Sequence, residues 1–382
     1  MSDAICSDRA TGEAKGVLKV RYYVLTDERT DLRQMGDTNF AASTARQSER
    51  ARKRRWFTSL CADHEANRLY CGQTNRAGSI LHEFNPATGK FRDLHYEKVA
   101  DEHDMKIHRG LWLDPKERAL YFGIATLSPT QSLLEAPGGR LVRYDLERRR
   151  FYTLGIPLAG NYIQATNYDP VRKRMYAFLE PSRSFAVWSL RRRKLVRVHC
   201  MDSIVHVAAI DDAGGVWGTC SHRHYFFRYD PESDKFTVRD TCVMPSARVA
   251  SDVMYEGAGP VDSMLNGGDG FLYVGSAIGE LYRLDPVSFD LLYLGKPLPY
   301  NRLPGLCLGA DGMIYGVGGT DDQTTLFRFD RSKQRFEILG RVAAPDGTTC
   351  FRPHDLVALN GAFYVAETDT PGRSGYLWEC RL

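Results

Sequence analysis

Short runs in which apolar and polar residues alternate recur along the whole chain and fall into seven similar units. In each unit a tyrosine or tryptophan stands just before small or apolar residues. About a dozen residues later, an aromatic residue or leucine usually meets Asp, Asn or Glu. The unit repeats every 40–55 residues or so, which is the range of propeller blades. The seven aromatic positions are Tyr70, Tyr121, Tyr176, Trp217, Tyr273, Tyr315 and Tyr364.

Each unit predicts four short β-strands, because period-two alternation is typical of half-buried strands. In the second unit we expect strands at 110–113, 119–123, 140–145 and 150–155, separated by turn-forming residues. The pattern therefore predicts an all-β fold, a seven-bladed β-propeller with four-stranded antiparallel blades, as one domain over 1–382. The approximate blades are 55–95, 107–155, 161–199, 204–240, 260–295, 303–340 and 352–382.

The seventh unit ends too early to form a complete blade. Its last predicted strand contains Trp378, and the chain stops four residues later at Leu382. The segment 17–25, near the N-terminus, has strand composition but belongs to no blade of its own. We predict that it supplies the missing outer strand and closes the ring, because closure leaves only short, protected strand edges.

Composition and charge narrow the classes of function. The chain has no run of about 18 apolar residues, so no transmembrane helix is predicted. Lys and Arg number 51 against 47 Asp and Glu, which is too balanced to predict nucleic-acid binding. The nine cysteines show no metal-type CxxC spacing and are expected as thiols in a reducing compartment. We expect a cytoplasmic protein with no membrane partner, although a chain whose signal had been removed would look the same.

Function is expected where the innermost strand of each blade begins. In a propeller, the loops that lead into these strands open on one face, so the first residues of the strands surround the central channel there. Four histidines fall at this face, at strand starts or at the loops beside them: His108, His206, His222 and His354. The same face is expected to carry Arg109, Tyr162, Gln164, Arg352 and Trp56.

A cluster of His, Tyr and Arg favours proton transfer over acyl or phosphoryl transfer. Histidine exchanges a proton near neutral pH, and arginine binds a carboxylate through two parallel hydrogen bonds. A tyrosine phenol can protonate a leaving oxygen. Together these roles describe β-elimination from a uronic acid, in which the carboxylate is neutralised, the C5 proton is removed and the 4-O-linked sugar is expelled. Trp56 and Tyr162 are then candidates for stacking on sugar rings.

The chain resembles the seven-bladed propellers among polysaccharide lyases, of the oligogalacturonate, ulvan and rhamnose–glucuronate lyase types. The local resemblance is carried by 106–111, which reads Lys-Ile-His-Arg-Gly-Leu, and by 352–355, which reads Arg-Pro-His-Asp. It implies His108 and His206 as base candidates, Tyr162 as acid, and Arg109 or Arg352 as the group that neutralises the carboxylate. Gln164, His222, Arg352, His354 and Trp56 would contact an anionic saccharide. The Gln/His metal cluster of the oligogalacturonate type has no counterpart here.

Two other functions remain open at this point. A metal-dependent propeller lactonase or antibiotic-type lyase would place a divalent cation at the channel mouth, and His206, His354, Asp355 and Glu367 are its candidate ligands. A non-catalytic scaffold that binds other proteins is the third reading. The sequence does not determine whether a metal is bound, which sugar is recognised or how many subunits assemble.

Overall fold

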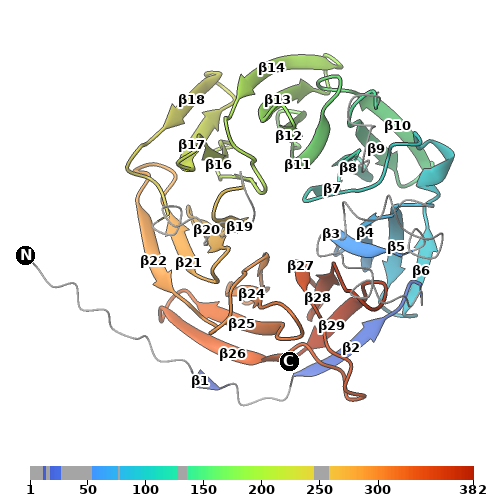
Figure 1. Cartoon of the computed structure of the whole chain (residues 1–382), viewed down its shortest axis with the longest axis vertical. Coiled ribbons are helices and arrows are strands. Elements are labelled where there is room, and N and C mark those ends of the chain that lie inside the picture. The colour runs from blue at the N-terminus through green and yellow to red at the C-terminus, as the bar shows by residue number, and fades with distance from the viewer. Residues whose placement is uncertain (1–11, 14–17, 27–53, 76–77, 127–135, 245–257) are drawn as a thin grey trace, which may run out of the picture.

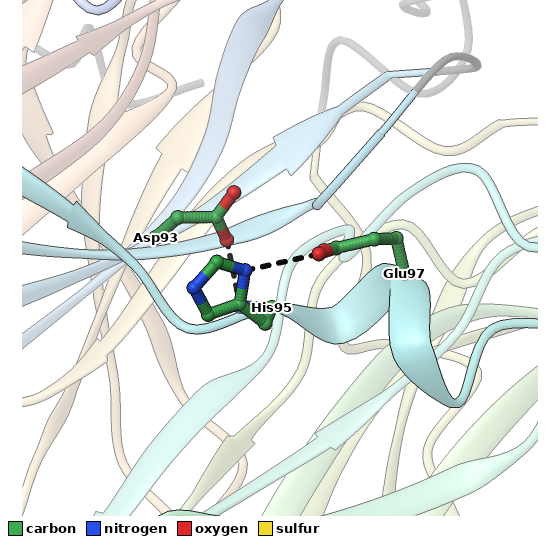
Figure 2. Close-up of side chains that lie close together, drawn as sticks. All are labelled: Asp93, His95 and Glu97. Carbon is green, nitrogen blue, oxygen red and sulfur yellow. Dashed lines mark hydrogen bonds and ion pairs between the residues drawn. The ribbon is translucent and has the colours of Figure 1, made fainter.

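The chain forms a ring of seven β-sheets around a central axis (Figure 1). This computed structural model describes residues 12–13, 18–26, 54–75, 78–126, 136–244 and 258–382. The predicted all-β, seven-bladed propeller with four-stranded blades is confirmed. Within these ranges the only helical element is the short 3-10 helix η2 (Tyr96–Lys98), which follows the outermost strand of the first blade (Figure 2). No helix among the described residues is long and apolar enough to span a membrane.

The blades follow one another in chain order, with the innermost strand first. The first two comprise β3 (Trp56–Asp63), β4 (Arg68–Thr74), β5 (Leu81–Asn85), β6 (Lys90–Asp93), then β7 (Leu111–Asp114), β8 (Ala119–Gly123), β9 (Leu141–Asp145) and β10 (Arg150–Gly155). The next two comprise β11 (Tyr162–Asp169), β12 (Arg174–Glu180), β13 (Ser184–Ser189), β14 (Lys194–Cys200), then β15 (Ala209–Ile210), β16 (Val216–Cys220), β17 (Tyr225–Asp230) and β18 (Lys235–Val238).

The fifth and sixth blades comprise β19 (Val261–Asn266), β20 (Leu272–Ser276), β21 (Leu281–Leu284), β22 (Leu291–Gly295), then β23 (Gly305–Leu308), β24 (Ile314–Gly318), β25 (Thr325–Asp330) and β26 (Arg335–Arg341). The last blade contributes β27 (Pro353–Leu359), β28 (Ala362–Glu367) and β29 (Leu377–Arg381) from the C-terminal end of the chain. It therefore needs an outer strand from elsewhere.

The N-terminal segment closes the ring as predicted. Strand β2 (Lys19–Tyr23) pairs antiparallel with β29 along its whole length. The carboxylate of Glu379 accepts hydrogen bonds from the Arg21 guanidinium at 2.9 Å and from the Tyr23 hydroxyl at 2.6 Å. Tyr22 packs against Trp378, with ring centroids 5.3 Å apart. The two ends of the chain are thus joined by a strand ladder and by side-chain contacts.

A second N-terminal pairing was not predicted. Strand β1 (Gly12–Glu13) runs parallel to β26 and adds a fifth strand to the outer edge of the sixth blade. Two residues, a glycine and a glutamate, give too short a pattern to predict a strand from sequence. The outer edge of β26 offers unpaired backbone groups, and this pairing covers part of that edge.

The repeated aromatic–small motif has a packing explanation. All seven motif aromatics are at most 3% exposed. The small residue next to them lets the following blade approach: a Cβ atom on Gly72 would lie 2.9 Å from Ile107, and one on Gly123 would lie 2.6 Å from Ile163. Both isoleucines belong to the next blade in the ring. The motif therefore serves both the core of its own sheet and the contact between neighbouring blades.

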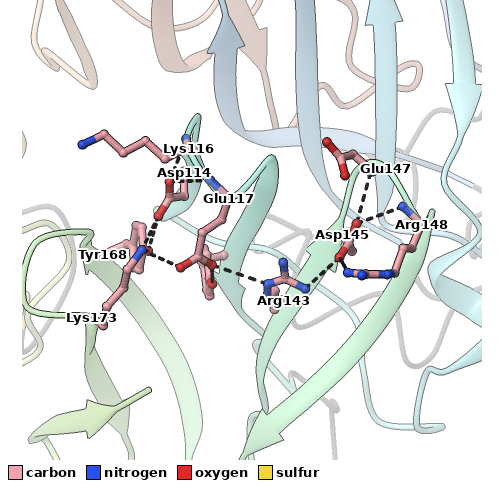
Figure 3. Close-up of polar contacts among 10 residues, drawn as sticks. Asp114, Lys116, Glu117, Arg143, Asp145, Glu147, Arg148, Tyr168 and Lys173 are labelled. Carbon is pink, nitrogen blue, oxygen red and sulfur yellow. Dashed lines mark hydrogen bonds and ion pairs between the residues drawn. The ribbon is translucent and has the colours of Figure 1, made fainter. Parts of the chain in front are cut away.

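Polar contacts also join neighbouring blades near the surface (Figure 3). Asp114 is the last residue of β7. Its Oδ2 accepts a hydrogen bond from the Tyr168 hydroxyl at 2.6 Å and forms an ion pair with Lys173 Nζ at 2.7 Å. Its other oxygen caps the backbone N–H groups of its own turn. Asp145 caps the turn between β9 and β10 in the same way. The basic runs at 148–150 and 191–194 are exposed in such outer turns.

We predict that the closing contact is essential for stability. Trp378 is fully buried, and replacing it with alanine should lower the free energy of unfolding by about 3–5 kcal/mol through the lost burial and the cavity left behind. Urea denaturation measures the change. Val287→Ala is the control, because Val287 is 86% exposed and its truncation should change stability by no more than about 0.5 kcal/mol. A loss below 1 kcal/mol in Trp378→Ala would contradict the importance of this contact.

Candidate functional site

The motif aromatics locate a ring of equivalent residues around the channel. Each aromatic pairs with one residue of the innermost strand of its blade: Cys61, Trp112, Asn167, Ala209, Leu265, Cys307 and Val357. Counting back three residues from each of these paired residues gives one residue per blade near the start of the innermost strand. We call these seven residues the channel ring: Thr58, Arg109, Gln164, His206, Asp262, Pro304 and His354.

A β-bulge occurs at the channel ring in four of the seven blades. The register between the first two strands shifts at Thr58, Gln164, Asp262 and His354. Such a bulge leaves one residue outside the ladder and changes the direction of its side chain. In the second blade Arg109 itself has a positive φ of 46° and precedes Gly110, whose Cβ would lie 2.2 Å from the Thr166 hydroxyl oxygen. Glycine is therefore required at position 110.

Three of the four predicted histidines meet at the channel. The ring centroid of His108, the neighbour of Arg109, lies 5.0 Å from that of His206 and 5.1 Å from that of His354. These residues come from three different blades, and all are buried, at 5–7% exposure. Burial lowers the pKa of each of them well below its usual value, and the nearby positive charges of Lys106 and Arg109 lower it further. All three imidazoles are therefore neutral at pH 7.

Gln164 determines which nitrogen carries the hydrogen in two of these imidazoles. His108 Nδ1 lies 2.7 Å from the main-chain carbonyl oxygen of Gln164, which can only accept, so Nδ1 is protonated and Nε2 keeps its lone pair. The side-chain Nε2 of Gln164 donates to His206 Nδ1 at 3.0 Å, so the hydrogen of His206 lies on Nε2. One residue thus gives two adjacent histidines opposite tautomers, one with a basic Nε2 and one with an N–H donor there.

Two cationic side chains lie beside the histidines. Arg109 donates to the Pro304 carbonyl oxygen at 2.7 Å and lies 3.5 Å from Asp262, which also forms a two-pronged ion pair with Arg302. Lys106 is next to this group, and burial lowers its pKa to about 8, against the opposing effect of Asp369. A lysine of this pKa is charged below pH 8 and is less strongly hydrated than a surface lysine, which suits the binding of an anion.

The other residues predicted from sequence have different surroundings. His222 is exposed in the turn between β16 and β17, and Trp56 is buried at 3% exposure, so its ring is not presented to solvent. Arg352 lies 3.5 Å from both Asp321 and Asp369. Burial, and then the nearby carboxylate of Glu180, raises the pKa of the Tyr162 phenol to about 12.

The ligand set predicted for a metal at the channel mouth is not assembled. Glu367 is fully buried and accepts hydrogen bonds from the backbone of Phe351 and Tyr376 and from Arg373. Asp355 accepts from the backbone N–H groups of Leu60 and Leu356. The donor atoms of His206, His354, Asp355 and Glu367 do not form a group with metal-binding spacing. Both carboxylates have structural roles instead.

Sequence reasoning assigned no role to several polar residues near the histidines. Lys106 precedes β7, Arg302 precedes β23, and Asp262 is the second residue of β19. Glu180 ends β12 and is buried beside Tyr162, and burial raises its pKa to about 7. Their place in the repeat was the only signal available. The ion pair of Arg302 with Asp262 joins residues 40 positions apart in sequence.

A cavity of about 360 Å³ lies in the channel next to the ring. Arg109, Pro304 and Asp355 contribute to its wall at the level of the ring, and Ala62 and Leu308 contribute at the far ends of their strands. The three buried histidines do not line it. The ring therefore separates this cavity from the face on which the innermost strands begin, and Arg109 is the ring cation that reaches into the cavity.

Known proteins resemble this chain in fold but not detectably in sequence. No protein-family model and no curated protein sequence matches it. A streptogramin B lyase structure superposes with a TM-score of 0.66 at 10% identity, covering 96% of this chain and 98% of that one. A catalytically inactive histidine-to-alanine variant of virginiamycin B lyase from Staphylococcus aureus, solved with quinupristin, gives 0.65 at 12% identity, covering 96% and 99%. U3-55K gives 0.59 at 9% identity, covering 86% and 95%.

Identities this low establish the propeller fold alone. The comparisons support a seven-bladed propeller over nearly the whole chain. The similarity to polysaccharide lyases that the sequence suggested stays a prediction.

We predict that Gln164→Glu reverses the tautomer of His206. A carboxylate can only accept, so the hydrogen of His206 should move to Nδ1, whereas His108 should not change because its partner is a main-chain carbonyl. Nitrogen-15 NMR of the imidazoles reports which nitrogen is protonated. Gln323→Glu, at an exposed position, is the matched control. Finding hydrogen on His206 Nδ1 in the unmodified protein would overturn the assignment.

The buried histidines should also make the fold sensitive to acid. Their pKa values are lowered in the folded state, so below pH 6.5 the unfolded chain binds more protons and stability falls as the pH falls. Each of the three contributes at most about 1.4 kcal/mol per pH unit to this slope. We expect His354→Gln to make the decline between pH 7 and pH 5 shallower in urea denaturation. His64→Gln, at an exposed residue, should leave the slope unchanged; equal slopes in all three proteins would exclude the explanation.

Proposed function

We propose that this propeller is a lyase that cleaves a carboxylate-bearing substrate by β-elimination at the channel ring. The observation that carries the proposal is the pair of opposite tautomers that Gln164 imposes on His108 and His206. His108 is neutral at pH 7 and keeps its lone pair on Nε2, which is the protonation state that a general base requires. A neighbouring neutral N–H can stabilise the negative charge that develops when a proton is removed. Because both imidazoles are buried, they stay neutral, and each keeps its own tautomer.

The proposed reaction uses His108 as the base. Its Nε2 removes the proton from the carbon next to the substrate carboxylate, and the electrons of the C–H bond form a carbon–carbon double bond. The bond from the adjacent carbon to its oxygen substituent breaks, and the leaving oxygen takes the proton back from the His108 imidazolium. His206 Nε2–H donates a hydrogen bond to the carboxylate, while Lys106 and Arg109 balance its charge.

Tyr162 remains an alternative donor of the proton to the leaving oxygen. Its pKa of about 12 keeps the phenol protonated across neutral pH. Glu180, with a pKa raised to about 7 by burial, is the titratable group beside it. Tyr162 would act only if the substrate spans the distance between the third blade and the histidines.

Two substrate classes follow from different observations. The cations beside the histidines favour a carboxylate, and a uronic-acid oligosaccharide offers a carboxylate, an acidified C–H bond and a leaving oxygen in one ring. The structural neighbours favour a second candidate, a streptogramin B type antibiotic, since two of them are lyases named for that class. A non-catalytic scaffold would not need a tautomer-matched histidine pair.

Turnover of a substrate panel tests the proposal. Uronic-acid oligosaccharides and quinupristin are incubated with the protein, and formation of the unsaturated product is followed by absorbance. His108→Gln should lower kcat by roughly 10²- to 10⁴-fold, the usual size of a general base contribution. His199→Gln, at an exposed residue on the outer strand β14, is the control that should retain full activity. No product from either class, or full activity in His108→Gln, would exclude the proposed reaction.

Lys106 supplies an independent pH signature in the same assay. Its pKa of about 8 means that KM for an anionic substrate should rise as the pH increases through 8, because the lysine loses its charge. Lys106→Met should have a high KM at every pH, and Lys106→Arg should keep a low KM above pH 8. A KM that is independent of pH and of these changes would remove Lys106 from substrate binding.

A further inference from the structure

A second group of potential ligand side chains lies at the opposite, outer edge of the first blade. Strand β6 is the outermost strand of this blade and ends at Asp93 (Figure 1). His95 and Glu97 follow at the start of η2, so three ligand-type residues alternate along five positions of the chain. One ligand atom from each of the three lies within 4.8 Å of the others, and they form the only such group of three among the described residues.

The backbone at His95 creates this arrangement. His95 adopts left-handed φ and ψ angles of 63° and 43°, and its N–H donates to Asp93 Oδ1 at 2.7 Å. Its side chain lies between the two carboxylates, with Nδ1 3.0 Å from Glu97 Oε1 (Figure 2). Donor atoms at such spacings can share one ion, because ligand oxygen and nitrogen atoms stand about 2.0–2.2 Å from zinc.

A buried histidine behind the group gives independent evidence. His82 on β5 pairs directly with Asp93 on β6 and is only 4% exposed. Its Nε2 lies 3.7 Å from Asp93 Oδ2, which is beyond hydrogen-bonding distance, and its Nδ1 has no hydrogen-bond partner among the described residues. Buried polar groups are normally satisfied, so an imidazole with an unpartnered Nδ1 and with Nε2 facing Asp93 is unusual, and it can support a carboxylate that binds an ion.

Neighbouring cations do not provide that partner. Arg92 pairs with Glu83, and Arg55 donates to the Ser79 carbonyl oxygen at 2.8 Å. The group therefore combines two carboxylates with one imidazole, and a second imidazole lies behind Asp93. Imidazole ligands favour zinc and related transition metals, whereas calcium and magnesium prefer oxygen ligands alone.

We propose that Asp93, His95 Nδ1 and Glu97 bind a divalent transition metal of the zinc type, with His82 supporting Asp93 from behind. His95, Asp93 and Glu97 are partly exposed, so an ion reaches them from solvent, while His82 lies on the core side of Asp93. The ion links the end of β6 to η2. It lies at the outer edge of the blade and takes no part in the chemistry of the channel ring.

Zinc titration of chelator-treated protein tests the site. Calorimetry should detect one tight zinc site per chain, and the melting temperature should rise with zinc because the ion binds the folded state. His95→Ala should abolish this site. His82→Gln should weaken it by roughly 10- to 100-fold, the usual effect of removing a supporting group. Cobalt(II) in place of zinc should show visible absorption that is lost in the same variants.

Matched variants separate this site from other histidines. His199→Ala, an exposed histidine on β14, should bind zinc as the unmodified protein does. Zinc binding that persists in His95→Ala, or that disappears in His354→Gln instead, would overturn the proposal. Glu97→Gln, at a half-exposed residue, repeats the test if His95→Ala does not fold, with circular dichroism as the check on folding. Lyase activity is not part of the readout, so failure of the proposed reaction leaves this result unaffected.

Discussion

The contact on which this structure depends is the pairing of each innermost strand with the aromatic-bearing strand beside it. The buried Tyr or Trp fixes the register of that pair, and the adjacent small residue allows the next blade to approach, as Gly72 does for Ile107. A slip of one residue would turn every side chain to the other face of its sheet. Because seven blades repeat the same register, the residue three positions before the paired residue occupies an equivalent place in every blade.

The channel ring departs from that regularity in a controlled way. Bulges at four of its positions release one residue from the ladder, and this places polar groups where a regular strand would place packing side chains. Burying such groups is unfavourable unless they are hydrogen-bonded. Gln164 meets this requirement for two histidines with one residue, and Asp262 does so for two arginines. The hydrogen bonds that Gln164 forms with His108 and His206 therefore also determine which nitrogen of each imidazole is protonated.

The cluster at the end of β6 and the cluster of histidines at the channel are assembled in different ways. Asp93, His95 and Glu97 are neighbours in sequence, and a left-handed backbone conformation at His95 is enough to bring them together. The histidines of the channel come from the second, fourth and seventh blades and meet because the ring closes. Closure itself depends on β2 and on the contact of Tyr22 with Trp378.

The sequence by itself determined the seven blades, their strand order and the closing strand, because these follow from local alternation and from a repeat that can be counted. It also placed His108, His206 and His354 at one face, since the start of a strand is a position in the repeat. Only the tertiary structure decided that His222 is exposed, that Trp56 is buried and that Glu367 is held by Arg373. Only the structure brought Gln164 between two histidines. The physical reason is that hydrogen bonds and burial at the channel join blades 40 or more residues apart, and a bulge changes a side chain's direction without changing the repeat.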